Sequence, residues 1–188
     1  SSDLATQPNA QPGDIRFVDV NGDGVVNADD RTKIGDPFGD FSIGWNLNLN
    51  VYNFDLSVTT YGLFGNDIFR GYERNLNYTN KPVSVLARWT GEGTSNFEPR
   101  ATFVDSNNNV RPSTRYVEDG SYFKIKNVQL GYNFNVANSK VLDAVRLYLQ
   151  GKNLMTFTDY TGYDPEMSYG VLDTGIDRGN YPSPRTVS

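Results

Sequence analysis

Apolar and polar residues alternate along the segment that begins at Phe41. The even positions that follow carry serine, glycine or asparagine, and the odd positions are apolar: Ile43, Trp45, Leu47, Leu49 and Val51. A period of two over about ten residues is typical of a β-strand. A second alternating run starts at Phe54 after a tight turn, so the pattern predicts a long β-hairpin over residues 41–61.

Two more alternating runs occur at 121–134 and 145–150, and they predict a second hairpin over residues 121–153. Long polar segments surround the hairpins, and residues 185–188 resemble the start of another strand. These polar segments are residues 1–40, 62–120 and 154–184. Loops this long are unusual in a compact domain. Outer-membrane β-barrels, in contrast, join strands of about ten residues by short periplasmic turns and long outer loops.

The order of these elements predicts an all-β fold, and two kinds of fold fit it. In a transmembrane β-barrel the apolar face of each strand meets lipid. In a soluble β-sandwich the same face meets a second sheet. Alternation alone does not distinguish the two.

The charged residues within the strands test the barrel. A basic residue at mid-membrane on the lipid face costs about 2–4 kcal/mol, so charges should share the polar phase. Asp55, Arg146 and Lys152 do so. Lys124 and Lys126 instead share parity with the apolar positions that follow them. They either stand above the membrane or precede a β-bulge near residue 127 that resets the phase, and we favour the first explanation because they adjoin a long loop.

Aromatic residues give a further indication. If the short turns are periplasmic, four of them fall at the same membrane edge: Tyr52, Phe54, Tyr132 and Phe134. Rings at the membrane–water boundary form the girdle that is typical of outer-membrane barrels.

The composition excludes several kinds of function. The 188 residues include no cysteine and no histidine, so a disulfide, a thiolate zinc site and a histidine general base are excluded within this chain. A net charge of −5 argues against a nucleic-acid partner, which requires a basic surface. A mean hydropathy of −0.54 without a long apolar run predicts no transmembrane helix. The first residues show no signal peptide, so we expect a piece of a larger protein.

A twelve-residue acidic loop over residues 19–30 matches the spacing of a calcium-binding loop. Its candidate ligands are five side-chain oxygens and one backbone carbonyl, from Asp19, Asn21, Asp23, Asn27, Asp30 and, through its carbonyl, Val25. Gly24 permits the sharp turn at the sixth position. Asp30 replaces the usual glutamate and no flanking helices are evident, so the alternative is a turn that binds nothing. We expect a structural Ca²⁺ ion here.

A carboxylate pair in the segment 154–184 is a weaker candidate for acid–base chemistry. It would come from Asp164, Glu166, Asp173 or Asp177. Solvated loop charge is the preferred interpretation of these four residues, and we expect the chain not to be an enzyme.

Several short segments, spread over nearly the whole chain, together carry a resemblance to a known family. They are residues 12–24, 34–37, 41–49, 53–57, 65–68, 88–90, 113–122, 126–132, 151–154 and 160–166. In this order they resemble the C-terminal part of the SusC/RagA family of TonB-linked outer-membrane proteins. A match of many ordered segments is more specific than a single motif.

The resemblance implies an all-β fold, the C-terminal portion of a large antiparallel transmembrane β-barrel of the TonB-dependent transporter type, in the bacterial outer membrane. Segments 1–40, 62–120 and 154–184 would be extracellular loops, and residues 185–188 the start of the final strand. The family imports oligosaccharides or peptides with a SusD-like surface lipoprotein as a lid. Further implied partners are the rest of the barrel, a plug, outer-membrane lipid, and TonB through an N-terminal part absent from this chain. The alternative is a secreted, calcium-stabilised β-sandwich that binds glycans.

Overall fold

The computed structural model describes residues 3–73, 81, 83–135, 144–167, 170 and 173–188. The chain divides into two compact units. We call Gly35–Phe69 with Val117–Ser188 the sheet unit, and Ser1–Ile34 with Arg70–Tyr116 the loop unit.

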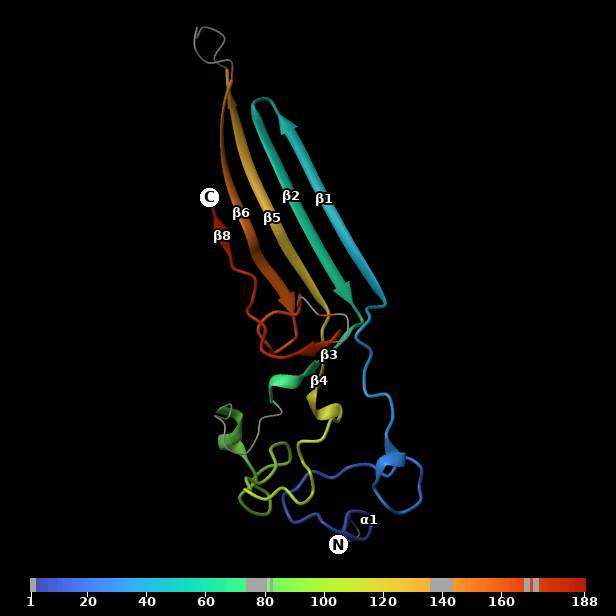
Figure 1. The fold of residues 1–188 in the computed structure, drawn as a ribbon. Coiled ribbons are helices and arrows are strands. Elements are labelled where there is room, and N and C mark those ends of the chain that lie inside the picture. Colours follow the sequence, from blue (N-terminus) through green and yellow to red (C-terminus); the bar gives the residue numbers. More distant parts are fainter. Residues whose placement is uncertain (1–2, 74–80, 82, 136–143, 168–169, 171–172) are drawn as a thin grey trace. The chain divides into compact units, whose positions relative to one another are not determined.

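The sheet unit contains a five-stranded antiparallel sheet in the order β1-β2-β5-β6-β8 (Figure 1). Its strands are β1 (Phe41–Val51), β2 (Phe54–Phe64), β5 (Tyr122–Phe134), β6 (Val145–Thr158) and β8 (Thr186–Val187). Strands β2 and β6 extend beyond the expected hairpin ends at residues 61 and 153. The expected turn between β5 and β6 falls largely on residues outside the described ones.

Short strands also lie within segments that the sequence predicts to be loops. Strands β3 (Asp67–Arg70), β4 (Val117–Asp119) and β7 (Ile176–Asp177) form a second sheet in the order β4-β3-β7. The Phe69 N–H donates to the carbonyl of Gly175 at 2.7 Å, just before β7. Strands this short contain too few residues for alternation to reveal them.

One face of the large sheet is apolar. The register places Leu49 opposite Leu56, Leu56 opposite Leu130, and Leu130 opposite Leu149. Even in mid-sheet, Leu130 is 48% exposed and Leu149 is 61% exposed. A β-sandwich would bury this face under a second sheet, and no described residue covers it. The sandwich alternative is therefore wrong, whereas a lipid-facing barrel wall explains the exposed face.

Aromatic rings gather at both ends of the apolar face. At the β1–β2 turn, Phe54 lies opposite Tyr132 with ring centroids 4.7 Å apart. At the far end, Phe41 stacks on Phe64 at 5.0 Å. Tyr52, in the turn itself, is fully exposed with a positive φ of 54°. This arrangement fits rings at the two edges of a lipid layer.

The other face of the sheet is polar and carries many amides. They come from three strands: Asn46, Asn48 and Asn50 of β1, Asn127 and Gln129 of β5, and Gln150 of β6. The Gln150 amide donates to the Asn127 side-chain oxygen at 2.7 Å, across β5 and β6. Nearer the β1–β2 turn, Arg146 of β6 pairs with Asp55 of β2.

The loop unit consists mainly of irregular segments and short helices. Its helices are α1 (Asp3–Thr6) and the 3₁₀ turns η1 (Ala28–Asp30), η2 (Gly71–Glu73), η3 (Val83–Ala87) and η4 (Thr114–Tyr116). None of the described helices is long and apolar enough to cross a membrane.

Buried amide side chains stabilise the loop unit in place of a large apolar core. Gln7 donates to the side-chain oxygen of Asn107 at 3.0 Å and accepts the Phe17 N–H at 2.8 Å. Asn109 accepts the Ile15 N–H at 2.8 Å. All three amide residues are at most 5% exposed. Side chains therefore supply the hydrogen bonds that a neighbouring strand would otherwise give this backbone.

Candidate functional site

The acidic loop 19–30 folds around its own first carboxylate. The Oδ1 of Asp19 accepts the Gly22 N–H at 2.7 Å, and Oδ2 accepts the Gly24 N–H at 2.8 Å. Gly22 and Gly24 have φ angles of 76° and 87°, which other residues rarely adopt. The spacing of aspartate and glycine in the sequence thus sets the shape of the turn.

Asp30 closes the loop at its other end. Its Oδ2 accepts the Asn27 N–H at 2.7 Å, and its Oδ1 accepts the Val20 N–H at 2.8 Å. The hydrogen bond from Asn27, followed by that from Val20, holds the pKa of Asp30 below its usual range, although some desolvation opposes them. Asn27 also caps η1, because its side-chain oxygen accepts the Asp29 N–H at 2.7 Å.

The loop folds its first and last candidate ligands against the same stretch of backbone. Asp19 accepts the Gly22 and Gly24 N–H groups, and Asp30 Oδ1 accepts the Val20 N–H at 2.8 Å, with the Asn21 N–H at 3.4 Å. No group of three or more Asp or Glu residues poised for a metal occurs among the described residues. A complete calcium shell would therefore also need amide oxygens and a backbone carbonyl.

The remaining candidate ligands are partly engaged within the loop. Asp23 Oδ1 accepts the Val25 N–H at 2.8 Å, and Asp23 Oδ2 accepts the Asn21 amide at 3.1 Å. The Asn27 amide approaches the Val25 carbonyl at 3.4 Å. Oxygens that accept one hydrogen bond still have a lone pair for a cation. The six-ligand set stays a prediction.

A β-bulge interrupts the large sheet at Lys126. Adjacent Thr59 and Thr60 of β2 face Asn127 and Ile125 of β5, so Lys126 is one extra residue on β5. The bulge moves Lys124 to the polar face. A bulge that resets the phase is therefore present, whereas the sequence alone favours a position of both lysines above the membrane. The sequence also indicates the bulge, because the apolar residues lie at odd positions before residue 126 and at even positions after it.

The bulge places two lysines against two acidic residues of the segment 154–184. The Lys124 ammonium lies 3.1 Å and 3.2 Å from the two carboxylate oxygens of Asp164, and 2.9 Å from Glu166. Lys126 also pairs with Glu166. We call Lys124, Lys126, Asp164 and Glu166 the lysine–acid cluster. Lys124 and Asp164 are buried, at 1% and 9% exposed, whereas Lys126 and Glu166 stay partly in contact with water.

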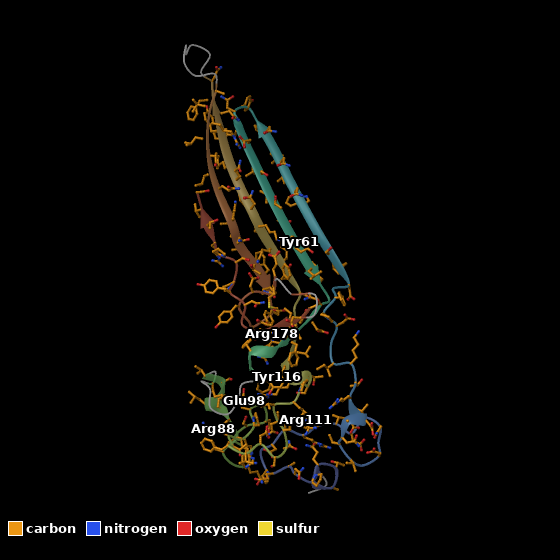
Figure 2. The ribbon with its side chains drawn as sticks, viewed as in Figure 1. Tyr61, Arg88, Glu98, Arg111, Tyr116 and Arg178 are labelled. Carbon is orange, nitrogen blue, oxygen red and sulfur yellow. The ribbon has the colours of Figure 1, made fainter. Side chains whose placement is uncertain are left out.

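The other two acidic residues of this segment differ from each other. Asp177 is 1% exposed, and it accepts the Tyr160 hydroxyl at 2.6 Å and the Gly179 N–H at 2.7 Å. Asp173 pairs with the exposed Arg178 at 2.7 Å (Figure 2). Solvated charge therefore describes Asp173 but is wrong for the buried Asp164 and Asp177. Their partners give these carboxylates a structural role.

The loop unit contains further arginine contacts whose partners the sequence does not indicate. Arg111 stacks over the Phe17 ring at 3.8 Å, and burial lowers the pKa of its guanidinium although Asp105 opposes this (Figure 2). Arg115 pairs with Glu98 at 2.8 Å beside a cavity of about 370 Å³. These contacts connect residues distant in sequence, so no local motif could show them.

Curated proteins similar to this chain are TonB-dependent receptors. The chain is 35% identical to TonB-dependent receptors P3 and P26 of Formosa agariphila, over 96% and 94% of its residues. It is 28% identical to TonB-dependent receptor SusC of Bacteroides thetaiotaomicron over 95% of its residues. The chain spans about a fifth of the length of these relatives, between 17% and 19%.

Solved structures give the same result for the fold. The RagAB peptide importer in the closed-closed state matches 94% of this chain with a TM-score of 0.70 and 22% identity, and this chain covers 20% of the matched chain. A structure of the RagAB peptide transporter matches with the same TM-score at 21% identity. No protein-family model matches. The resemblance to the SusC/RagA family is confirmed, and the chain belongs with the SusC-type TonB-dependent receptors as a segment of their outer-membrane β-barrel.

Proposed function

We propose that this chain supplies barrel wall and extracellular loops to a TonB-dependent importer of oligosaccharides or peptides. The observation that carries the proposal is the large sheet, apolar and exposed on one face and amide-rich on the other, in a chain homologous to TonB-dependent receptors. The polar face would line the inside of the barrel, next to a plug supplied by the rest of the protein. Energy would come through TonB, so the chain itself needs no catalytic residue. That the relatives are named as receptors fits our expectation that it is not an enzyme.

A SusD-like surface lipoprotein is the partner we propose for the outer side. The likeness to SusC and to RagAB supports such a partner. Segments 1–40, 62–120 and 154–184 would then lie outside the cell, beneath or beside the lid. The name of the RagAB peptide importer supports peptides as the imported substrate, and oligosaccharides are the alternative.

The test uses the full-length protein in its own host. Deletion of the gene should reduce uptake of either a labelled casein digest or a labelled mixture of plant and algal oligosaccharides. The wild-type gene should restore that uptake only while the proton gradient is intact. Uptake of both mixtures that is unchanged by the deletion would contradict an import function. Uptake that persists after the gradient is dissipated would contradict the role of TonB.

We also propose that loop 19–30 binds a structural Ca²⁺ ion through Asp19, Asn21, Asp23, the Val25 carbonyl, Asn27 and Asp30. Support comes from the turn that Asp19 and Asp30 stabilise through backbone N–H groups and from the oxygen-rich donor set, which suits a hard cation. The ion would brace the loop unit.

Calorimetric titration of the intact assembly with Ca²⁺ tests this site. Wild type should release or absorb heat, and the Asp19→Ala and Asp23→Ala variants should lose that signal. The control is Asp29→Ala, in the same loop but outside the proposed ligand set. No heat with wild type, or the same heat with all variants, would refute the calcium site.

A further inference from the structure

We infer that residues 159–167 and 173–184 form a rigid segment that stays in contact with the polar face of the sheet, and that Lys124 anchors the segment there. The inference concerns the sheet unit alone and does not depend on import. It rests on the position of Lys124, on the burial of its charge and on the additional contacts of the same segment.

The bulge determines where the segment attaches. Lys124 lies opposite Tyr61 of β2 and Thr156 of β6, on the polar face, at the end of the sheet away from the β1–β2 turn. Asp164 contacts the Lys124 ammonium with both oxygens, so the segment lies against the polar face at this end.

Asp164 also ties together two distant parts of the segment. It accepts the Glu166 N–H at 3.0 Å and the Ser183 N–H at 3.1 Å. One carboxylate thus fixes the chain at residue 166 and again just before β8. If Asp164 moves, the chain is released at both places.

Additional contacts hold the same segment to the small sheet. Glu118 of β4 accepts the Thr161 N–H at 2.9 Å and the Thr161 hydroxyl at 2.8 Å. Asp177 of β7 accepts the Tyr160 hydroxyl at 2.6 Å. The segment is therefore attached at several separate points rather than at one hinge.

The buried charge makes detachment unfavourable. An ammonium that is 1% exposed has little water around it and depends on its carboxylate partners. If the segment moved away from the sheet, the Lys124 ammonium would lose both of its carboxylate partners, Asp164 and Glu166. Any movement that admits a ligand should therefore occur in other loops, while this segment keeps its place.

Hydrogen–deuterium exchange of the purified full-length protein tests the inference. The amides of Glu166 and Ser183 should exchange as slowly in wild type as amides within β5. The Lys124→Met variant should speed their exchange by about ten-fold or more, because Asp164 loses its partner. The Gly179 amide, bonded to Asp177, should change much less.

Two further variants distinguish loss of the Lys124–Asp164 contact from a general loss of folding. Asp164→Asn, which keeps the side-chain shape, should also speed exchange at Ser183 even if Lys124→Met fails to assemble. Arg178→Ala, which removes only an exposed pair with Asp173, should leave all these amides unchanged. Fast exchange at Glu166 and Ser183 in wild type would overturn the inference, as would unchanged exchange in both Lys124→Met and Asp164→Asn.

Discussion

Asp55 of β2 pairs with Arg146 of β6 across the intervening strand β5. The Arg146 Nε lies 3.1 Å from Asp55 Oδ1, and a second guanidinium nitrogen contacts Oδ2. Between them stands Gly131, whose register partners are Asp55 and Tyr148. A Cβ atom at Gly131 would lie only 2.5 Å from Asp55 Oδ1. The absence of a side chain on β5 is what allows the two charges to meet.

Replacing Gly131 with alanine should therefore displace the Asp55 carboxylate and weaken the sheet. Overpacking of this kind costs about 1–3 kcal/mol. The measurement is heat-induced unfolding of the full-length barrel in detergent, with Gly44→Ala as the matched control. Gly44 lies on the polar face of β1 with no atom within 4 Å of its Cβ position, so its substitution should have little effect. Equal unfolding temperatures for the two variants would contradict this role of Gly131.

Reversing the charges tests the pair itself. Asp55→Arg alone should slow assembly of the barrel, because two guanidinium groups then face each other on the polar side. The Asp55→Arg/Arg146→Asp double variant should recover part of the loss, since the opposite charges meet again. Assembly is followed by the fraction of folded, unheated protein on a denaturing gel. A double variant as defective as the single one would show that the pair does not couple β2 to β6.

Deleting Lys126 should remove the bulge without changing the phase of β5. Ile125 and Asn127 already face the adjacent residues Thr60 and Thr59, so joining them directly leaves a regular ladder with Lys124 still on the polar face. We expect this deletion variant to assemble in the outer membrane. Inserting one alanine between Lys124 and Ile125 should instead turn Lys124 to the apolar face and abolish assembly. Membrane fractionation and surface proteolysis distinguish the two. Failure of the deletion variant together with normal assembly of the insertion variant would refute the register.

Acidification should loosen loop 19–30 through Asp30. Because the folded pKa of Asp30 is lowered, its stabilising effect is complete above the ordinary carboxyl pKa of about 3.9 and is lost as pH falls through the folded value. In the presence of a chelator, Asp30→Asn should speed exchange of the Val20 and Asn27 amides at neutral pH. The ratio of variant to wild-type rates should approach one in acid. The Gly24 amide, bonded to Asp19, is the internal control.

The four long strands could be predicted from the sequence because each contains an alternating run of six or more residues. Strand pairing in β1–β2 followed from the tight turn at residues 52–53. The short strands β3, β4 and β7 could not be predicted, since each depends on a partner far along the chain. The loop at 19–30 showed its turn glycines in the sequence, but the hydrogen bonds that Asp30 accepts from the Val20 and Asn27 N–H groups depend on the folded backbone.

The contacts of the lysine–acid cluster could not be predicted from local sequence patterns. The parity of Lys124 was visible in the sequence, and it allowed either a position above the membrane or a bulge. Only the pairing of Thr59 and Thr60 with Asn127 and Ile125 decides between them. The acidic partners of Lys124 lie some forty residues away, so their burial could not be inferred from a loop rich in charge.

The bulge at Lys126 also determines which length change this strand can accept during evolution. Loss of that one residue would join Ile125 directly to Asn127 and leave the other residues of β5 on their present faces. A single insertion elsewhere in β5 would instead exchange lipid-facing and interior positions on one side of the insertion. Homologues should therefore differ in β5 length mainly at this bulge, whereas other single insertions and deletions should accumulate in the loops.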